Sequence, residues 1–331
     1  MDLTQPIDIT AVNNTRVKYT NVLIPLNMLS VASVLGLATP FTGVQSSVLV
    51  GKTKHGKIMA KYTGSFKGDK QLGVVAPRTL VVYPVVAEMA DEPERYRRSF
   101  IADVAGGLWD AKKHPFEAWL LQFGINAADE EFHDKIWTAK HDDAEGKNEF
   151  ENSFDGWFTI FDNEIGTGKI STAKKNMFST GEITELNAGK VLLEMWRAAH
   201  PTLKRQQTNM IISSDLGELY DDWYMLNHDN PPGVDQAGQM FLEGTNRKCR
   251  LVRQTAFPVG SQRVILTTKQ NLLYGTDKLS DMKNMKAFNS GNPYMFTAAM
   301  KFVFGTQILS LDERDLLIND QPGIPSGSGS V

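Results

Sequence analysis

The C-terminal third of the chain alternates between apolar and more polar residues. Within Tyr294–Leu309 the apolar side chains fall at every second position, at Phe296, Ala298, Met300, Phe302 and Phe304. A period of two residues is typical of a half-buried β-strand. Other β-prone runs are Thr79–Ala87, Met210–Ile212, Leu251–Phe257 and Arg263–Thr268. The pattern therefore predicts strands in both halves of the chain, the last of which returns to join a sheet.

Other segments have the spacing of amphipathic helices. The helices predicted from it are Glu94–Val104, Pro115–Phe123, Ala127–Lys140, Asn187–His200 and one that starts at the capping-box-like Asp215-x-x-Glu218. Trp157–Phe161 is predicted as a short strand. This mixture of helices and strands predicts an α+β fold.

Residues 51–76 differ from the rest of the chain because they are rich in glycine and lysine. We expect Lys57–Tyr62 to pair with Thr79–Ala87 as a long two-stranded arm, which is only marginally stable unless it lies on something else. The residues of this arm that we expect to contact a partner are Lys52, Lys54, Lys57, Lys61, Phe66, Lys67 and Lys70.

An acidic patch surrounds the third predicted helix. Its candidate contact residues are Asp129, Glu130, Glu131 and Asp134. Three interpretations of the basic stretch stay open: a solvated surface, a nucleic-acid contact, or a segment that lies across this acidic patch on a neighbouring copy. Complementary charge would steer that association and set its register.

Motifs for catalysis or cofactor binding are not evident. Gly166-Thr167-Gly168-Lys169 lacks the following Ser or Thr of a phosphate-binding loop, and His141–Asn152 lacks the first and last ligands of a calcium loop. The histidines are scattered, and the single cysteine, Cys249, cannot form an intrachain disulfide. We therefore expect no cofactor, no metal and no catalytic site.

Composition and charge exclude few functions. Apolar residues make up 41% of the chain and charged residues 22%, which predicts a folded globular protein. The formal net charge is −3, unlike that of a dedicated sequence-specific DNA-binding protein. The most apolar window, Leu23–Phe41, contains two prolines and several polar residues, so we expect no membrane span.

Two consecutive segments near the C-terminus, Phe257–Thr268 and Asn271–Asp277 (NLLYGTD), precede the long strand Met300–Ile308. Upstream lie Phe154-Asp155-Gly156 and Asn209–Ser213, the latter followed by a predicted helix. In this order the segments resemble the major capsid proteins of tailed bacteriophages that have the Hong Kong 97 phage-type fold. The likeness covers roughly residues 50–310.

The resemblance implies a division of the chain. It gives an N-terminal arm at 1–50, an extended β-hairpin loop at 51–90 and a peripheral domain with a spine helix at 91–150. An axial domain at 151–245, return strands of the peripheral domain at 246–310 and a C-terminal tail at 311–331 follow. His114-Pro115 and several glycines interrupt the helical pattern where the family has its long spine helix.

The resemblance also implies a function. It indicates a structural major capsid protein, not an enzyme, that self-assembles into the icosahedral shell around a phage double-stranded DNA genome. The implied partners are other copies in hexamers and pentamers, scaffold and portal proteins and, non-specifically, packaged DNA, with no membrane. The implied location is the virion capsid, assembled in the host bacterial cytoplasm. The alternatives are a nanocompartment shell of the same fold and a soluble α+β enzyme.

Overall fold

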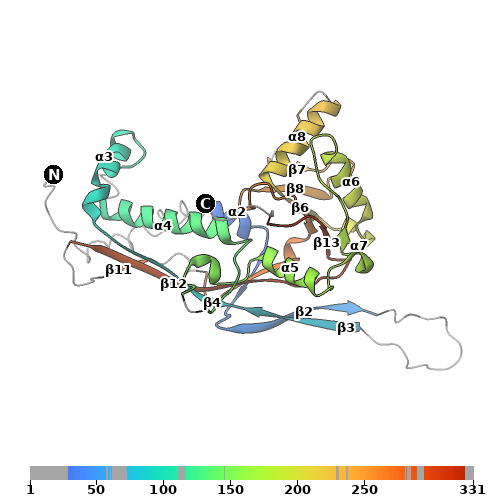
Figure 1. The fold of residues 1–331 in the computed structure, drawn as a ribbon, viewed down its shortest axis with the longest axis horizontal. Coiled ribbons are helices and arrows are strands. Elements are labelled where there is room, and N and C mark those ends of the chain that lie inside the picture. Colours follow the sequence, from blue (N-terminus) through green and yellow to red (C-terminus); the bar gives the residue numbers. More distant parts are fainter. Residues whose placement is uncertain are drawn as a thin grey trace.

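The computed structural model describes residues 29–324 apart from internal gaps. The gaps are 57–58, 60, 62–72, 111–115, 145, 229–230, 236–237, 280, 282–284 and 289–293. The described chain is elongated and consists of two sheets with their helices and a separate two-stranded hairpin (Figure 1).

The first sheet is built around one long strand, β12 (Phe296–Ile308). At thirteen residues it spans about 43 Å. β12 pairs antiparallel with β10 (Leu272–Thr276), with β11 (Lys286–Phe288) and with β4 (Tyr83–Asp91). The short strand β1 (Thr39–Thr42) pairs parallel with β10. The alternation predicted for 294–309 is therefore confirmed, and β4 confirms part of the run Thr79–Ala87.

The helix α4 (Phe116–Lys135) packs along this first sheet (Figure 1). The sequence predicted two helices here, but one continuous helix of twenty residues forms. Gly124 lies within it, where the side chain of Met89 of β4 fills the space that a Cβ at this position would need. The helix α2 (Leu29–Leu35) buries Val31 and Val34 in the same core, whereas α3 (Arg97–Ala105) lies beyond the N-terminal end of α4 (Figure 1).

Aromatic side chains fill the core between the first sheet and its helices. Phe304 of β12 contacts Phe132 of α4 and Phe154 edge to face, with ring centroids 4.8 and 4.9 Å apart. Trp137 packs on Trp157, the first residue of α5 (Trp157–Gly166). The strand predicted for 157–161 is therefore wrong. Five consecutive buried residues on a helix enclosed by the core leave no polar face, and such a run resembles a buried strand.

The second sheet has six strands in the order β5-β13-β9-β6-β8-β7. Their bounds are β5 Met177–Phe178, β6 Thr208–Ser213, β7 Met240–Phe241, β8 Cys249–Gln254, β9 Ile265–Thr267 and β13 Leu316–Asn319. The helices α6 (Ala188–Ala198), α7 (Pro201–Arg205) and α8 (Ser214–His228) accompany it, and α6 and α8 pack on it with a core separate from the first (Figure 1).

The sequence correctly predicted α6, β6 and α8, but not the start of α8. The Ser213 hydroxyl accepts a hydrogen bond from the amide of Leu216 at 3.0 Å, so Ser213 caps the helix instead of Asp215. Cys249 is fully buried in β8, and burial raises the pKa of its thiol to about 12.

The sheets do not follow the division implied by the resemblance. Residues 246–310 contribute β8 and β9 to the second sheet and β10, β11 and β12 to the first. The predicted tail 311–331 contains β13, whose four residues are all buried, and only 325–331 lie outside the described residues. The predicted loop 51–90 likewise ends in β4 of the first sheet.

Candidate assembly interface

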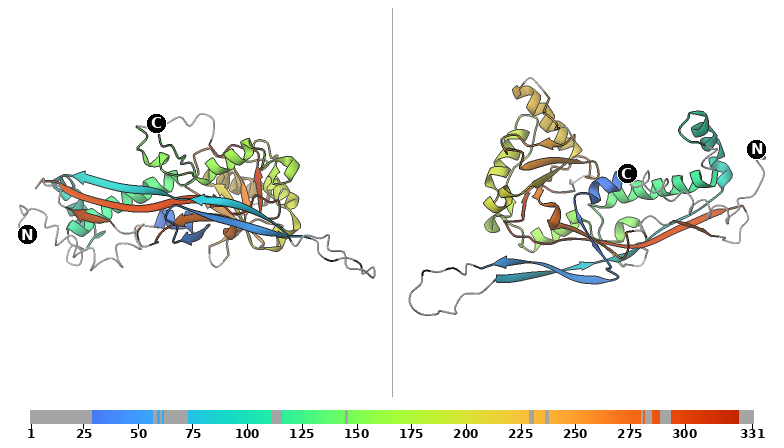
Figure 2. Two further views of the ribbon diagram at one scale, coloured as in Figure 1. Left: turned by 90° about the horizontal axis from the view of Figure 1, so that it is seen from below. Right: turned by 180° about the vertical axis from the view of Figure 1, so that it is seen from behind.

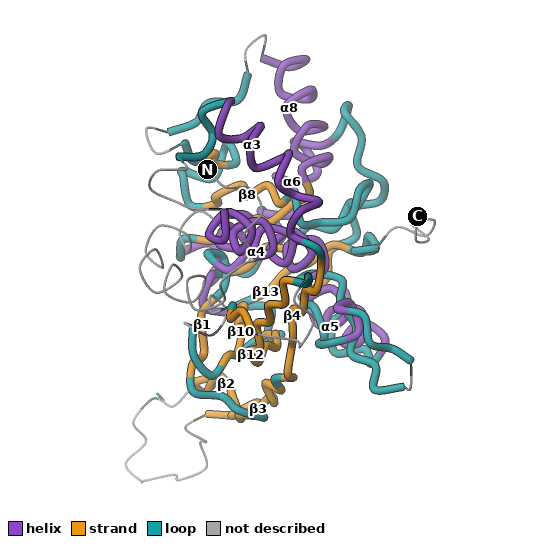
Figure 3. Tube along the Cα trace, turned by 90° about the vertical axis from the view of Figure 1, so that its left-hand side faces the viewer, coloured by secondary structure: helices purple, strands orange, loops and turns teal. Residues whose placement is uncertain are grey.

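A two-stranded hairpin projects from the region where the two sheets meet (Figures 1 and 2). It consists of β2 (Ser47–His55) and β3 (Gly73–Val81), which pair antiparallel over nine residues. The strand β2 begins earlier than the predicted Lys57–Tyr62, most of which lies outside the described residues. Figure 3 shows the hairpin and α8 at opposite ends of the molecule.

Apolar contacts fix only the base of the hairpin. Val50 and Leu80 pack against Leu273 of β10 in a small cluster of their own. Farther along, Gly51, Thr53, Ala76 and other described residues are exposed. A lone hairpin with so little burial is marginally stable in water, so its outer part gains stability only on another surface.

Polar contacts complete the anchor at the base. Arg78 Nη2 of β3 lies 2.7 Å from Glu164 Oε1 of α5 and 2.9 Å from Gln307 Oε1 of β12. Gln307 Nε2 in turn donates to the carbonyl of Thr79 at 2.6 Å. Burial raises the pKa of Glu164, but hydrogen bonds and charge from Lys169 and Arg78 outweigh that effect and lower it. Glu164 is therefore charged at neutral pH and holds the hairpin in one direction.

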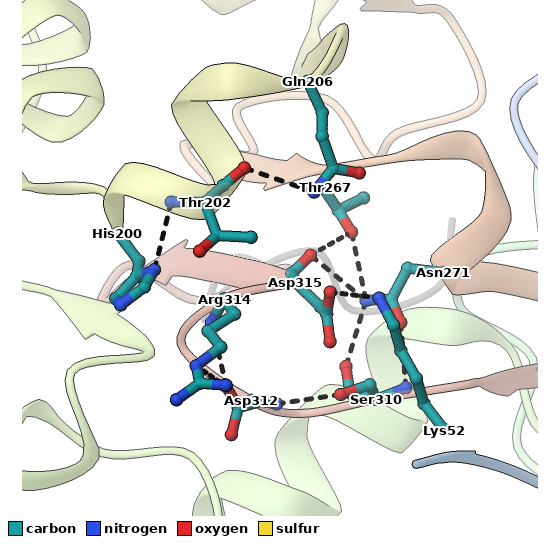
Figure 4. Close-up of polar contacts among 10 residues, drawn as sticks. All are labelled: Lys52, His200, Thr202, Gln206, Thr267, Asn271, Ser310, Asp312, Arg314 and Asp315. Carbon is teal, nitrogen blue, oxygen red and sulfur yellow. Dashed lines mark hydrogen bonds and ion pairs between the residues drawn. The ribbon is translucent and has the colours of Figure 1, made fainter. Parts of the chain in front are cut away.

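Lys52 takes a role other than the one predicted for it. Its Nζ lies 2.5 Å from Asp315 Oδ1 of the same chain (Figure 4). Asp315 precedes β13, and its side chain is nearly buried. This lysine therefore belongs to the anchor and is not free for a neighbour. Lys61 is exposed and Lys54 lies on β2, whereas Lys57, Phe66, Lys67 and Lys70 lie outside the described residues.

The four predicted acidic residues all lie on α4, but they divide between two surfaces. Asp129 and Glu131 line a cleft of about 1120 Å³, whereas Glu130 and Asp134 do not. Asp134 Oδ1 is 3.1 Å from His133 Nδ1. Of the predicted counter-surface, the structure thus brings only Asp129 and Glu131 together in a concave site.

Three elements form this acidic cleft. Every residue of β4 lines it, facing α4 and the segment 141–153. Its lining has one lysine, Lys147, and seven carboxylates. The carboxylates are those of Glu88, Asp91, Asp129, Glu131, Asp142, Asp143 and Glu149. Glu88 and Asp91 were not predicted as part of this surface, because they belong to a strand far from the other acidic residues in sequence.

Tyrosine side chains lie at both ends of the cleft. The hydroxyl of Tyr96 donates to Asp91 Oδ2 at 2.5 Å, and this bond lowers the pKa of Asp91. At the other end Tyr83 stacks on His141 with ring centroids 3.7 Å apart. Burial, together with the nearby Asp155 and Asp143, raises the pKa of Tyr83, so its hydroxyl stays neutral.

The cleft also exposes the edge of a sheet. Within the described chain β4 pairs with β12 alone, so its other edge has no strand partner. Val86 in the middle of β4 is 53% exposed. An unpaired strand edge offers backbone donors and acceptors to an extended segment. The site therefore suits an extended, positively charged segment of chain.

Other kinds of site are not found in the described part of the chain. No group of three or more His, Cys, Asp or Glu side chains converges there to hold a metal ion. No helix among the described residues is long and apolar enough to cross a bilayer.

Solved capsid structures share this fold. The satellite phage P4 procapsid, whose structure includes the size determination (Sid) protein, aligns with a TM-score of 0.57 and 12% identity over 93% of this chain and 91% of that one. The capsid of the empty GTA particle aligns with a TM-score of 0.52 and 9% identity, over 87% and 89% of the two chains. The cyanophage A-1(L) capsid gives 0.52 and 10%, over 86% and 91%.

No protein-family model matches the sequence, and no curated protein matches it either. The likeness to solved structures is one of fold. The chain has the α+β capsid fold of the Hong Kong 97 phage type that the ordered segments predicted.

Proposed function

We propose that the chain is a major capsid protein that self-assembles into the icosahedral shell around a double-stranded DNA phage genome. The observation that carries the proposal is the combination of a capsid fold with a hairpin whose outer part is exposed. The role is structural, and the subunit acts in the virion after assembly in the host cytoplasm. Scaffold and portal proteins are further proposed partners.

In this proposal the parts of the fold have distinct roles. The hairpin β2–β3 is the extended loop, the first sheet with α4 is the peripheral domain, and the second sheet with its helices is the axial domain. Residues 1–50 are assigned to the N-terminal arm, whose described elements α2 and β1 pack on the peripheral domain.

We further propose that the acidic cleft receives the lysine-rich segment of a neighbouring copy. Residues 51–76 carry six lysines and one acid, whereas the cleft carries seven carboxylates and one lysine. Of the predicted loop residues, Lys54, Lys57, Lys61, Phe66, Lys67 and Lys70 remain candidates for this contact. Opposite charge would raise the association rate and select one register among several.

Assembly of the purified protein tests both proposals. We expect electron microscopy of the wild-type chain, alone or with its scaffold protein, to show closed shells. The triple variant Glu88→Lys, Glu131→Lys and Asp143→Lys should keep its circular dichroism but sediment as unassembled subunits, because like charges then face each other.

The matched control has the same change of charge on the second sheet's domain. Its substitutions are Glu182→Lys, Glu185→Lys and Glu194→Lys, all at exposed positions. This control should assemble like the wild type. Normal shells from the cleft variant would refute the role of the cleft. A wild-type chain that stays monomeric with and without scaffold would refute the capsid function.

A further inference from the structure

A cluster of cations lies on the second sheet's domain, at the end where α7 is drawn and away from α4 (Figure 1). Arg197 lies in the last turn of α6, Lys204 and Arg205 end α7, and Arg247 and Lys248 occupy the turn before β8. Lys204 is half-buried and the other four are exposed. We call these five residues the basic patch.

Hydrogen bonds connect the parts of the basic patch. Lys204 Nζ donates to the carbonyl of Arg197 at 2.8 Å, which ties α7 to α6. Gln207 Nε2 donates to the carbonyl of Arg247 at 3.2 Å, which ties the segment after α7 to the turn. Next to them Thr208 pairs with Cys249 in the parallel strands β6 and β8. The five cations therefore belong to one continuous surface.

The charge of the basic patch is not neutralised within the described chain. No ion pair among the described residues involves any of the five. The carboxylate in the same turn, Glu243, accepts a hydrogen bond from the hydroxyl of Tyr224 at 2.7 Å. The chain as a whole has a formal net charge of −3, so this surface is more positive than the chain as a whole.

The turn that presents two of the cations has an unusual backbone. Asn246 and Arg247 have φ angles of +52° and +55°. Asparagine tolerates the left-handed region, but an arginine there is strained, and strained residues cluster at functional positions. The conformation places Arg247 and Lys248 side by side at the surface.

The chemistry of the basic patch indicates which polyanion it fits. No large apolar side chain is exposed in segments 197–208 or 243–250. A protein interface would need an apolar or aromatic centre, and single-stranded nucleic acid would need aromatic side chains for base stacking. Lysine, arginine and the amide side chains of Gln206 and Gln207 instead suit phosphate oxygens.

We propose that the basic patch binds the phosphate backbone of duplex DNA without reading its sequence. The inference rests on the proposed function, because a genome enclosed by the shell supplies the duplex. It goes further by assigning the contact to five residues and by orienting this end of the axial domain towards the DNA.

Salt dependence tests the proposal on full-length, unassembled subunits. Anisotropy of a fluorescent 30-base-pair duplex of random sequence would be measured between 50 and 200 mM NaCl. Each phosphate contact contributes a slope of about −0.9 to log K against log [salt], so five contacts give about −4.5, or about a 500-fold loss of affinity over this range. The variant with all five cations changed to glutamine should have a slope near zero.

The control variant loses the same number of positive charges, but at positions outside the basic patch. Its exposed lysines, each changed to glutamine, are Lys174, Lys269, Lys278, Lys286 and Lys301. This control should keep the wild-type slope to within about one contact. Equal slopes for both variants would overturn the inference, since net charge alone would then explain binding.

Electron microscopy of the same preparations separates this inference from the proposed function. Wild-type shells together with unchanged DNA binding by the quintuple variant would refute the basic patch and leave the capsid function standing. A variant that binds DNA normally but no longer assembles would mean that the basic patch contacts another subunit, and the inference would again be wrong. Loss of the slope supports the inference whether or not shells form, because it is measured on free subunits.

Discussion

Replacing Arg78 with methionine should loosen the hairpin without unfolding the body. The side chains of Arg78 and Glu164 are only 14% and 12% exposed, and their charged atoms are 2.7 Å apart. Methionine keeps most of the length of arginine but leaves the carboxylate without this partner. Because Arg78 is on β3 and Glu164 on α5, the loss acts on the attachment of the hairpin.

The magnitude follows from the partners that remain. Breaking a buried ion pair costs about 3–5 kcal/mol when the other charge is left uncompensated. Here part of the compensation remains, because Lys169 Nζ still lies 3.1 Å from Glu164 Oε2. This compensation is incomplete, since Lys169 is 57% exposed and its charge is screened by solvent. We therefore expect a loss of about 2–3 kcal/mol, smaller than for an isolated pair. Since about 1.36 kcal/mol corresponds to a factor of ten, local opening should become about 30- to 160-fold more frequent.

The effect should also depend on pH in a defined direction. The folded-state pKa of Glu164 is below its ordinary value of 4.5, so the carboxylate contributes stability above that pH. This contribution is lost as pH falls through the lowered folded-state pKa. The difference between variant and wild type should therefore be largest at neutral pH and shrink progressively as the pH falls below the ordinary pKa of 4.5 and through the lowered folded-state pKa.

Hydrogen exchange of the amides of β2 and β3 is the measurement. The ratio of exchange rates between variant and wild type at each pH cancels the intrinsic pH dependence of exchange. The control is Arg95→Met, which removes an exposed ion pair in which Arg95 Nε lies 3.3 Å from Glu92 Oε2. It should change the free energy of opening, as derived from the exchange rates, by less than about 0.5 kcal/mol. A ratio for Arg78→Met that is near one, or that does not change with pH, would refute the role assigned to the Glu164 pair.

Three further perturbations probe other parts of the fold. Gly305→Ala should destabilise the junction of β12 and the hairpin by several kcal/mol in urea unfolding, because a Cβ there would overlap the carbonyl of Val81; a loss below about 1 kcal/mol would contradict this contact. Phe304→Ala should cost about 3–5 kcal/mol in the same assay, since the ring is fully buried, and a much smaller loss would mean that the core is less tightly packed. Cys249 should react with iodoacetamide at pH 8 only as fast as its strand opens, because burial raises its thiol pKa to about 12, and labelling at the rate of a free thiol would contradict that burial.

Segments with one buried face were predictable from sequence. In β12 and α6 a single apolar face repeats at two and at 3.6 residues, and both elements form where the pattern places them. The helix α5 was not predictable in this way, because its first five residues are buried and the polar side of the period is missing. The close approach of Met89 to Gly124 of α4 involves a distant strand, so no local pattern can reveal it.

The candidate site was predictable only in part, for a similar reason. The acids of α4 form a cluster in sequence, but the cleft also requires Glu88 and Asp91, which β4 brings to it across the sheet. The basic stretch was recognisable from composition, yet Lys52 lies close enough to the base to pair with Asp315 of its own chain. Composition can therefore identify a charged segment, whereas the fold decides which of its charges are already paired.

The direction of the hairpin determines what kind of assembly the site can support. The strands β2 and β3 leave the body on the side away from α4, whereas the cleft lies between β4 and α4 (Figures 1 and 2). The hairpin, as it lies in the structure, does not occupy the cleft of its own chain. If the proposed contact forms, it joins two different surfaces of two copies, so that one copy still has its cleft free and the other still has its hairpin free. Such head-to-tail contacts either close into rings or continue as open filaments, depending on the rotation between neighbours. The anchor formed by Arg78, Glu164 and Lys52 fixes the direction of the hairpin, so it contributes to that rotation and to whether a closed shell can form.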